Sequence, residues 1–507
     1  MSRLTIALLL CAVFPVLAQP CRFSTFINDS LDTYIQDGLK SWDIPGLTIG
    51  VVKDGEIIFC EGYGVKSIRR QTRVDSNTLF MIGSLTKAIT GATTVLLSES
   101  DTLSLNDTIK KWIPDFQLKN RLASKHIIVE DILTGRTGLG SHQGDFLFWK
   151  TEHDTQHLLN ILSELSPQHQ VRQKFIYNNL SYMLLNVVIK RSIGNSWAEA
   201  VRDRFFLPLK MNNSYALSSQ IPLNTNIASP HLKNGNALLE LSVENIDNMG
   251  PAGSISSTAR DMCQWMMAFM DMGMVDGKRV FSERSMKIIR KPYQLRGYRT
   301  RKDNSNQLRF FFSGMGWSIH DEFDNLTYFH DGGTDGFKSF LMVLPERRFG
   351  VVVLTNSRSH NFAEAVADEL HYALQDEPYQ SFSTTYLAEF SEEWQAELAA
   401  QKTIEEGIIQ VSPETLKAFS GKYANKLYGS VSITQSDSGL TLNFLQHQNQ
   451  LSGRLQPIGN DSFLCTFSRP EFSPAKVQLF AIENSVKKLV FSAEAFGDMT
   501  YEFVKKK

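Results

Sequence analysis

"FMIGSLTKAITG", residues 80–91, places a serine and a lysine, Ser84 and Lys87, three positions apart in an otherwise small and apolar stretch. Positions i and i+3 share one face of a helix, so the two side chains would point the same way. A hydroxyl is a weak nucleophile unless a base lies beside it, and a lysine held out of water loses its proton more readily. The stretch therefore predicts a buried helix over residues 84–98 that begins with a nucleophile and its base.

The S-x-x-K spacing is a weak signal by itself, and a solvent-exposed helix cap is the alternative for any single match. The spacing recurs at Ser473/Lys476 and at Ser485/Lys488, in β-rich sequence. Side chains three apart lie on opposite faces of a strand, so these two matches cannot form a pair. The surrounding sequence must decide what Ser84 and Lys87 do.

Short β-rich runs lie on both sides of a long helical region. Residues 47–52 and 56–60 flank Asp54-Gly55, a hairpin signal. Helical patterns predominate over residues 105–209, strand patterns return over residues 316–356, and residues 361–375 read as an amphipathic helix. This order predicts an α+β fold, with an antiparallel sheet flanked by helices and an inserted helical subdomain.

Changes in sequence character divide the 507 residues into four parts. Residues 1–18 combine Arg3, a short apolar core and a small-residue cleavage site, which predicts a signal peptide and secretion. The apolar core is shorter than the roughly 20 residues of a membrane span. We expect the main domain at residues 22–385, a helical linker at 386–411 and a small β-barrel-like domain at 412–507.

Composition and charge exclude several partners. The net charge of −1 gives no field that would favour nucleic acid or an anionic membrane, and the sequence offers no metal or cofactor site. Four cysteines follow the signal, Cys21, Cys60, Cys263 and Cys465, and their pairing stays open. Six N-x-[ST] sequons occur, and those at Asn28, Asn106, Asn212, Asn325 and Asn460 are candidate glycosylation sites; the sixth, at Asn179, is expected to line a cleft and carry no glycan.

Two further motifs follow Ser84 in the chain. "FIYNN" holds Tyr177 and Asn179 in Y-x-N spacing, and "HDGGTDGF" begins at His330 between two β-runs. A loop tyrosine usually packs with its hydroxyl in water, but successive glycines let a backbone lie close against a ligand. The three weak signals occur in one order and support one another.

These motifs resemble those of the serine β-lactamase-related family, which includes class C β-lactamases, the DD-peptidases related to them and family VIII-type esterases. The segments NTLFMIGSLTKAIT, LSLNDTIKKWIPDF, PAGSISSTARDM and GMGW also resemble family segments, in the expected order. The resemblance covers about residues 24–375. By architecture the chain is most similar to secreted animal β-lactamase-like proteins.

The resemblance implies a catalytic role for three residues. Ser84 matches the acylated nucleophile, and Lys87 matches the partner that handles its proton. Tyr177 matches the residue that assists proton transfer to the leaving group and later activates water. The family then implies a small-molecule ester, amide or peptide substrate, no cofactor and no metal.

Four more positions match residues that bind or orient the substrate. Asn179 matches an amide that orients the lysine and the substrate. His330, Gly332 and the backbone of Gly333 match the strand edge beside the bound acyl group, where the N–H groups of Ser84 and Gly333 would form an oxyanion hole. Position 331 departs from the family pattern, because it is aspartate.

The sequence leaves two functions open. One is a secreted serine hydrolase that acts through an acyl-enzyme on Ser84. The other is a catalytically weak or inactive extracellular matrix or binding protein that kept the fold. The presence of Ser84, Lys87 and Tyr177 favours the hydrolase, and Asp331 favours neutral esters over anionic β-lactams.

Overall fold

The computed structural model describes residues 22–100, 102–148, 151, 153–235, 237–298, 310–358, 360–436, 439–447, 451–459, 461–472, 474–482, 485–492 and 500–506. The predicted signal peptide, Cys21 and Asn460 lie outside these residues. Within them, no helix is both long enough and apolar enough to cross a membrane.

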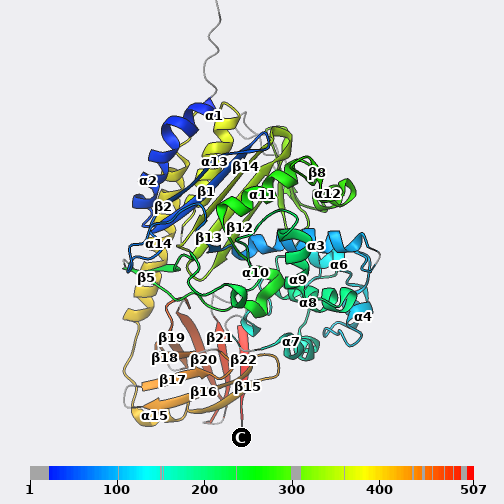
Figure 1. Cartoon of the computed structure of the whole chain (residues 1–507). Helices are drawn as coiled ribbons and strands as arrows, with labels where there is room; N and C mark the ends of the chain where they lie inside the picture. Colours follow the sequence, from blue (N-terminus) through cyan, green and yellow to red (C-terminus); the bar gives the residue numbers. More distant parts are fainter. Residues whose placement is uncertain are drawn as a thin grey trace, which may run out of the picture.

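An antiparallel sheet forms the centre of the larger part of the molecule (Figure 1). Eight strands from the described residues build it, in the order β2 (Glu56–Gly64), β1 (Gly46–Lys53), β14 (Phe349–Thr355), β13 (Phe337–Leu344), β12 (Asn325–Thr334), β11 (Ser318–Glu322), β10 (Phe310–Ser313) and β9 (Gln294–Tyr298). The two N-terminal strands thus pair with strands from the end of the domain. The antiparallel sheet built from both ends is confirmed.

Helices cover both faces of this sheet. Side chains on one face of β14, such as Val351 and Val353, pack with α1 (Arg22–Thr25), α2 (Leu31–Ser41) and α13 (Phe362–Leu374). Val352 and Leu354 point to the other face, which packs with α3 (Thr86–Ser98) and α11 (Ala259–Met270). Successive residues of a strand point to opposite faces, so a strand covered on both sides reads as the unbroken apolar run FGVVVLT.

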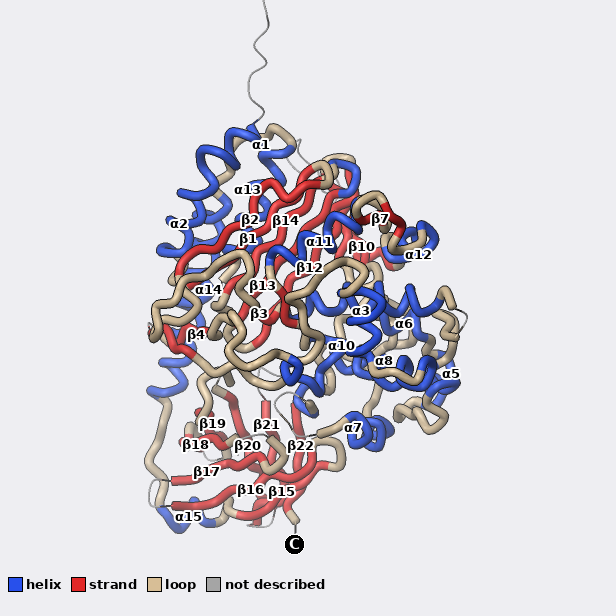
Figure 2. Tube along the Cα trace, in the orientation of Figure 1, coloured by secondary structure: helices blue, strands red, loops and turns tan. Residues whose placement is uncertain are grey.

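The helical region lies beside the sheet and continues the core around α3 (Figure 2). It contains α4 (Ile109–Trp112), α5 (Arg121–His126), α6 (Val129–Leu133), α7 (Thr155–Ile161), α8 (Asn179–Ile193), α9 (Trp197–Val201) and α10 (Gly250–Gly253). Two-stranded ribbons connect it to the sheet, formed by β3 (Phe80–Met81) with β6 (Ser256–Ser257) and by β4 (His231–Asn234) with β5 (Ala237–Glu240). A third ribbon, β7 (Met274–Val275) with β8 (Lys278–Arg279), precedes α12 (Glu283–Ile289).

A long helix, α14 (Phe382–Glu406), connects the sheet to the C-terminal part of the chain. The sequence predicted a helical linker at residues 386–411, and the helix in the structure begins four residues earlier, at Phe382, and ends at Glu406. Its first turns carry Phe382, Tyr386 and Phe390, which pack against the core beside α2 and α13. The start of α14 is therefore attached to the larger part of the molecule.

The C-terminal part is an all-β domain, as expected. After α15 (Pro413–Lys417), its described strands close an antiparallel barrel: β15 (Gly421–Asn425), β16 (Gly429–Ser436), β17 (Gly439–Phe444), β18 (Ser452–Pro457), β19 (Ser462–Phe467), β20 (Ala475–Ile482), β21 (Ser485–Ser492) and β22 (Thr500–Lys505). Figure 1 shows the barrel beneath the sheet and the helical region.

One aromatic side chain joins the barrel to the larger part of the molecule. Phe146 comes from the helical region, yet it is buried in the aromatic core of the barrel. Its ring centroid lies 4.5 Å from that of His447, 5.2 Å from that of Tyr501 and 5.5 Å from that of Phe444. The two parts thus share a core at this point.

The structure brings two of the predicted cysteines together. Cys60 on β2 pairs in register with Gly50 on β1, and a Cβ atom added to Gly50 would lie 2.4 Å from the Cys263 sulfur. The hydrogen bond between the two thiols lowers the pKa of Cys60. Both are free thiols, and Cys465 is a third, buried inside the barrel.

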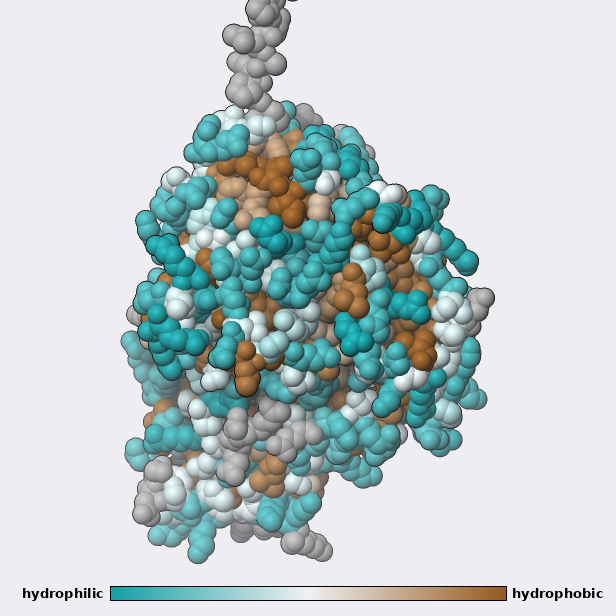
Figure 3. Space-filling view, viewed as in Figure 1, coloured by the Kyte–Doolittle hydropathy of each residue, from teal (hydrophilic) through white to brown (hydrophobic). Residues whose placement is uncertain are grey.

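The face of the molecule seen in Figure 3 is mostly hydrophilic, with apolar side chains gathered in small separate patches over the sheet and the helical region. Apolar residues are common on protein surfaces in such small groups. Among the described residues, this face therefore carries no broad apolar surface of the kind that docks a partner protein.

Candidate functional site

Ser84 lies at the junction between β3 and α3. It belongs to a 3₁₀ turn over Gly83–Leu85, and α3 begins only at Thr86. The predicted helix therefore starts two residues later than expected. Gly83 has a φ of 51°, and a Cβ atom there would lie 2.7 Å from the Gly333 nitrogen, so the close approach of β12 shapes this turn.

Lys87 extends from the first turn of α3 toward Ser84 and is 2% exposed. Its Nζ donates hydrogen bonds to the Ser84 Oγ at 3.0 Å and to the Ala252 carbonyl oxygen at 2.7 Å. Burial lowers the pKa of Lys87 to about 7, because desolvation disfavours the ammonium form. A large fraction of this lysine is therefore neutral near pH 7 and can accept a proton.

Tyr177 lies on the other side of the serine. Its hydroxyl forms a short hydrogen bond with the Ser84 Oγ, and the Lys87 Nζ lies 4.7 Å from the centre of its ring. Burial raises the pKa of Tyr177 well above its ordinary value, so the phenol keeps its proton at neutral pH. The structure thus brings together the serine, the lysine and the tyrosine that the sequence motifs predicted.

Asn179 begins α8 and faces the same site, but its amide contacts a carboxylate. The Asn179 Nδ2 donates to the Asp145 Oδ2 at 2.7 Å, and the His142 Nδ1 lies 2.8 Å from the same oxygen. No hydrogen bond between Asn179 and Lys87 occurs among the described residues; the Ala252 carbonyl holds the lysine instead. Asn178 caps α8 by accepting from the Ser181 N–H at 2.8 Å.

The third motif forms the edge of β12. His330 is buried, and its Nδ1 donates to the Asp331 carbonyl oxygen at 2.5 Å. Burial lowers the pKa of His330, so the imidazole is neutral near pH 7. A Cβ atom on Gly332 would lie 2.1 Å from the Ile82 carbonyl oxygen, so only glycine allows β12 to approach the serine turn. The next residue, Gly333, lies against Gly83 of the same turn.

Two hollows meet at Tyr177. The larger one, the catalytic cleft, has a volume of about 690 Å³ and is lined by Ser84, Asn179, Gly333 and residues of α14 and the barrel. The smaller one, the leaving-group hollow, has a volume of about 260 Å³ and is lined by Lys87, His330 and Arg296. Tyr177 and Asp331 line both, and the combined space is typical of a small-molecule site.

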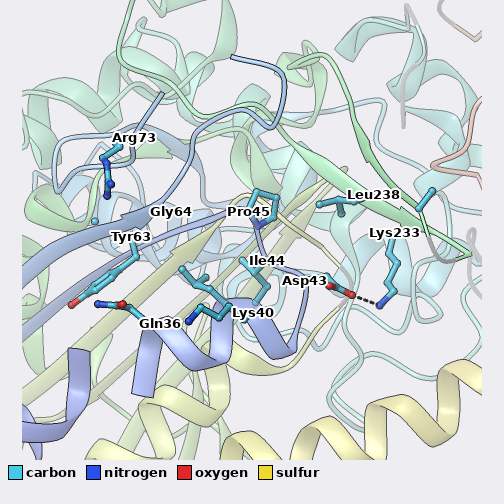
Figure 4. A pocket seen from close by; sticks show the side chains of 13 residues that line it. Gln36, Lys40, Asp43, Ile44, Pro45, Tyr63, Gly64, Arg73, Lys233 and Leu238 are labelled. Carbon is cyan, nitrogen blue, oxygen red and sulfur yellow. Dashed lines mark hydrogen bonds and ion pairs between the residues drawn. The ribbon is translucent and has the colours of Figure 1, made fainter. Parts of the chain in front are cut away.

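A separate groove of about 590 Å³ lies between α2 and the β4–β5 ribbon (Figure 4). The described residues that line it include no serine, threonine or cysteine, and its Lys233 is ion-paired with Asp43 at 2.9 Å. Across the described part of the chain, no group of three or more His, Cys, Asp or Glu side chains could hold a metal ion. The chemistry therefore centres on Ser84.

Four of the five sequons proposed as glycosylation sites can be placed. Asn28, Asn106 and Asn212 are exposed, and Asn325 is half-buried at the start of β12. The sixth sequon, at Asn179, was expected to lie in the cleft, and the structure places it there with its amide bonded to Asp145.

We expect Asn179 to carry no glycan when the chain passes through the secretory pathway of eukaryotic cells. A glycan is attached to the Nδ2 atom, which here donates to Asp145 in a cleft too small for a sugar chain. Glycopeptide mass spectrometry would measure occupancy, with the exposed Asn106 and Asn212 as internal controls. Substantial occupancy at Asn179 would contradict the arrangement of the site.

Sequence reasoning missed two supporting groups, the Asp145 carboxylate and the Ala252 carbonyl. Asp145 lies outside any motif, at the start of the 3₁₀ turn Asp145–Leu147. Ala252 lies in the segment PAGSISSTARDM, so its position was marked but its contact with Lys87 was not. Both act through tertiary contacts that no local pattern reveals.

Comparisons with known proteins agree with this geometry. A family model described as Beta-lactamase matches residues 31–375. Protein flp of Staphylococcus aureus (strain MW2) is 23% identical over 339 residues, which cover 66% of this chain and 64% of that protein. Unguisins hydrolase ungD of Aspergillus violaceofuscus is 27% identical over 364 residues, or 67% of this chain and 63% of that protein. The chain thus spans somewhat less than two thirds of the length of these curated relatives.

Two solved structures share the fold. The octameric penicillin-binding protein homologue from Pyrococcus abyssi superposes with a TM-score of 0.59 at 18% identity, over 94% of this chain and 99% of that one. A class C β-lactamase from Rhodobacter sphaeroides superposes with a TM-score of 0.54 at 20% identity, over 69% of this chain and 99% of that one. With a family model that matches most of its length and a β-lactamase/transpeptidase-like fold, this chain belongs to the Beta-lactamase family.

Proposed function

We propose that this chain is a serine hydrolase that forms an acyl-enzyme on Ser84. One observation carries the proposal: the Ser84 Oγ accepts a hydrogen bond from a buried lysine whose pKa is about 7, at a distance of 3.0 Å. Perturbed pKa values of this kind cluster at catalytic sites. That one relative is named as a hydrolase also supports the proposal.

In the first half of the reaction, neutral Lys87 takes the hydroxyl proton as the Ser84 Oγ attacks the substrate carbonyl carbon. Tyr177 keeps its own proton, because burial raises its pKa, so it can pass a proton on to the leaving group. The leaving group then departs on the side of Tyr177 and His330, into the leaving-group hollow.

The backbone N–H groups of Ser84 and Gly333 would stabilise the oxyanion, at a contact that only a glycine at position 332 permits. Such donors typically contribute about 2.7–4 kcal/mol each. In the second half, water attacks the acyl carbonyl carbon, Tyr177 and Lys87 take a proton from that water, and they deliver it to the Ser84 Oγ as the acid product leaves.

Covalent labelling tests this function directly. A fluorophosphonate probe should add its mass to the intact chain and to the peptide that contains Ser84, and Ser84→Ala should remove the label. A folded chain that stays unlabelled under conditions that label a control serine hydrolase would exclude the hydrolase. The result would then favour the extracellular matrix or binding role.

We also propose that the protein is secreted. The proposal is supported by the N-terminal pattern of a positive charge, an apolar core and a small-residue cleavage site. Expression in eukaryotic cells, followed by N-terminal sequencing of the protein from the medium, would test it. Retention of the chain inside the cell would contradict it.

We expect neutral short esters to be hydrolysed faster than anionic β-lactams. The Asp331 side chain is 63% exposed and lines the cleft, and the His330 beside it is neutral. A carboxylate here would repel a substrate carboxylate, and about 1.4 kcal/mol of repulsion lowers binding tenfold. Arg296 places a positive charge in the adjoining hollow. Comparing a neutral ester with an anionic β-lactam therefore shows whether Asp331 or Arg296 determines the preference for substrate charge.

The measurement is the ratio of kcat/KM for p-nitrophenyl acetate to that for nitrocefin. We expect Asp331→Thr to lower this ratio about tenfold. Exchange of another exposed acid, as in Asp115→Thr, is the matched control and should leave it unchanged. A parent enzyme that prefers nitrocefin would refute the charge argument.

A further inference from the structure

We propose that α14 and the barrel form the acyl-side wall of the catalytic cleft and select substrates with an uncharged, apolar acyl group. The large apolar side chains of this outer wall are Trp394 and Leu398 of α14 and Phe472 of the barrel, and Glu397, Gln401 and Glu471 line the cleft beside them. The inference rests on the proposed function, because it names the acyl group that Ser84 would carry.

The position of Ser84 determines which hollow holds the acyl group. Ser84 lines the catalytic cleft together with Asn179 and Gly333, whereas Lys87, His330 and Arg296 line the smaller hollow. Tyr177 lines both spaces, so it can protonate a leaving group that departs into the smaller hollow. An acyl chain that extends from the Ser84 Oγ into this cleft therefore points toward α14 and the barrel.

The charges in the cleft argue against an anionic acyl group. Three cations line it, but each has an acidic partner: Lys338 with Glu364 at 2.7 Å, Arg358 with Asp335 at 3.3 Å, and Lys233 with Asp43 at 2.9 Å. A carboxylate in this space would have to displace one of these partners. The apolar residues of the outer wall instead favour an apolar acyl chain, because burying that chain against them removes apolar surface from water.

Contacts outside the cleft hold the outer wall in place. The Trp394 ring stacks on Phe390 at 6.3 Å, and Phe390 packs against Trp42 of the larger part of the molecule at 5.7 Å. Phe472 packs against Phe467 at 5.5 Å.

The barrel segment next to Phe472 is tied to the helical region by charge. Arg469 pairs with Glu471 at 2.5 Å and with Glu244 of the larger part of the molecule. The wall is therefore held in place, and it can limit the length of the acyl group that fits in the cleft.

The outer wall lies beyond residue 375, where the family match ends. The core of the site, by contrast, lies within the matched residues. Substrate preference on the acyl side is therefore a property of α14 and the barrel, and it does not follow from membership of the family.

Leu398 provides the test, because it lines the cleft from a helix whose residues are not buried. Leu398→Asn keeps the size but removes the apolar contact, and Leu398→Trp fills the space. We expect either change to lower the ratio of kcat/KM for p-nitrophenyl hexanoate to that for p-nitrophenyl acetate by about fivefold or more. The value for acetate, whose acyl group carries only one methyl group, should stay within about twofold.

Ile404 gives the matched control, since it lies on the same helix, is 42% exposed and does not line the cleft. Ile404→Asn and Ile404→Trp should leave both esters unchanged. An unchanged ratio in the Leu398 variants, or an equal loss for both esters, would overturn the outer wall while the proposed function stands. A parent chain that hydrolyses neither ester would overturn the proposed function and the wall together.

Discussion

Replacing Ser84 with alanine should lower ester hydrolysis by about 10⁴-fold or more. In serine hydrolases of another fold, loss of the nucleophile costs about 10⁶-fold, because every later step depends on it. Ser84 is the hydroxyl that contacts both Lys87 and Tyr177. Turnover of p-nitrophenyl acetate by parent and variant, with equal thermal midpoints, would measure the effect.

Ser98→Ala is the matched control for this experiment. Ser98 ends the same helix, and its hydroxyl donates only to the Val95 carbonyl oxygen at 2.7 Å. We expect activity close to that of the parent. If Ser84→Ala keeps more than about a tenth of the parent activity, the nucleophile lies elsewhere.

Replacing Lys87 with methionine should abolish most activity and yet stabilise the protein at pH 7. General-base catalysis typically contributes 10²–10⁴-fold, so we expect a loss of about 10³-fold in kcat. The pKa of Lys87 is about 7 in the folded protein, against about 10.4 in an unfolded chain. At pH 7 and below, burying this lysine opposes folding by a few kcal/mol. Methionine avoids that cost but leaves the Ala252 carbonyl without its donor, which costs about 1–3 kcal/mol.

The pH dependence separates this effect from simple repacking. Between pH 7 and about pH 10.4 the unfolded chain binds a proton at Lys87 that the folded chain does not, so the stability of the parent rises with pH. The advantage of Lys87→Met should therefore shrink across this range, as seen in thermal midpoints from pH 6 to 10. Lys402→Met, on the exposed face of α14, should show no such trend. An advantage that is constant with pH would contradict the low pKa.

The same pKa predicts how activity depends on pH. Only neutral Lys87 can accept the Ser84 proton, so kcat/KM should rise with pH through about 7 and then level off. The rise should not come from His330, because burial lowers the pKa of that imidazole. His330→Gln should therefore keep the midpoint, whereas loss of the transition in this variant would assign it to the histidine.

The parts of the site that depend on local spacing could be predicted from the sequence. Ser84 and Lys87 lie one helical turn apart. The successive glycines predicted a close approach of the backbone, and at Gly332 that approach is to the Ile82 carbonyl oxygen. Asp145 and Ala252 could not be predicted as supports, because they reach Asn179 and Lys87 from segments distant in the sequence. Local patterns report which residues share a face of one element, and these contacts join different elements.

The same distinction applies to the fold. Alternation and turn residues predicted the sheet and the barrel as separate units. The start of α14 at Phe382, four residues before the predicted linker, was missed because Phe382 packs on a distant core and carries no local signal of its own. The contribution of α14 and the barrel to the cleft was missed for the same reason.

The insertion of Phe146 into the barrel has a consequence for how the chain is made. Translation proceeds from the N-terminus, and about 360 residues follow Phe146 before β22 is complete, which takes roughly 20–70 s at ordinary elongation rates. During that interval the side chain that will fill the barrel has no barrel to enter. Its neighbour Asp145, which holds Asn179, lacks the same support. A newly made chain therefore completes this joint, which lies next to the residue that supports Asn179, only after its last strand has emerged.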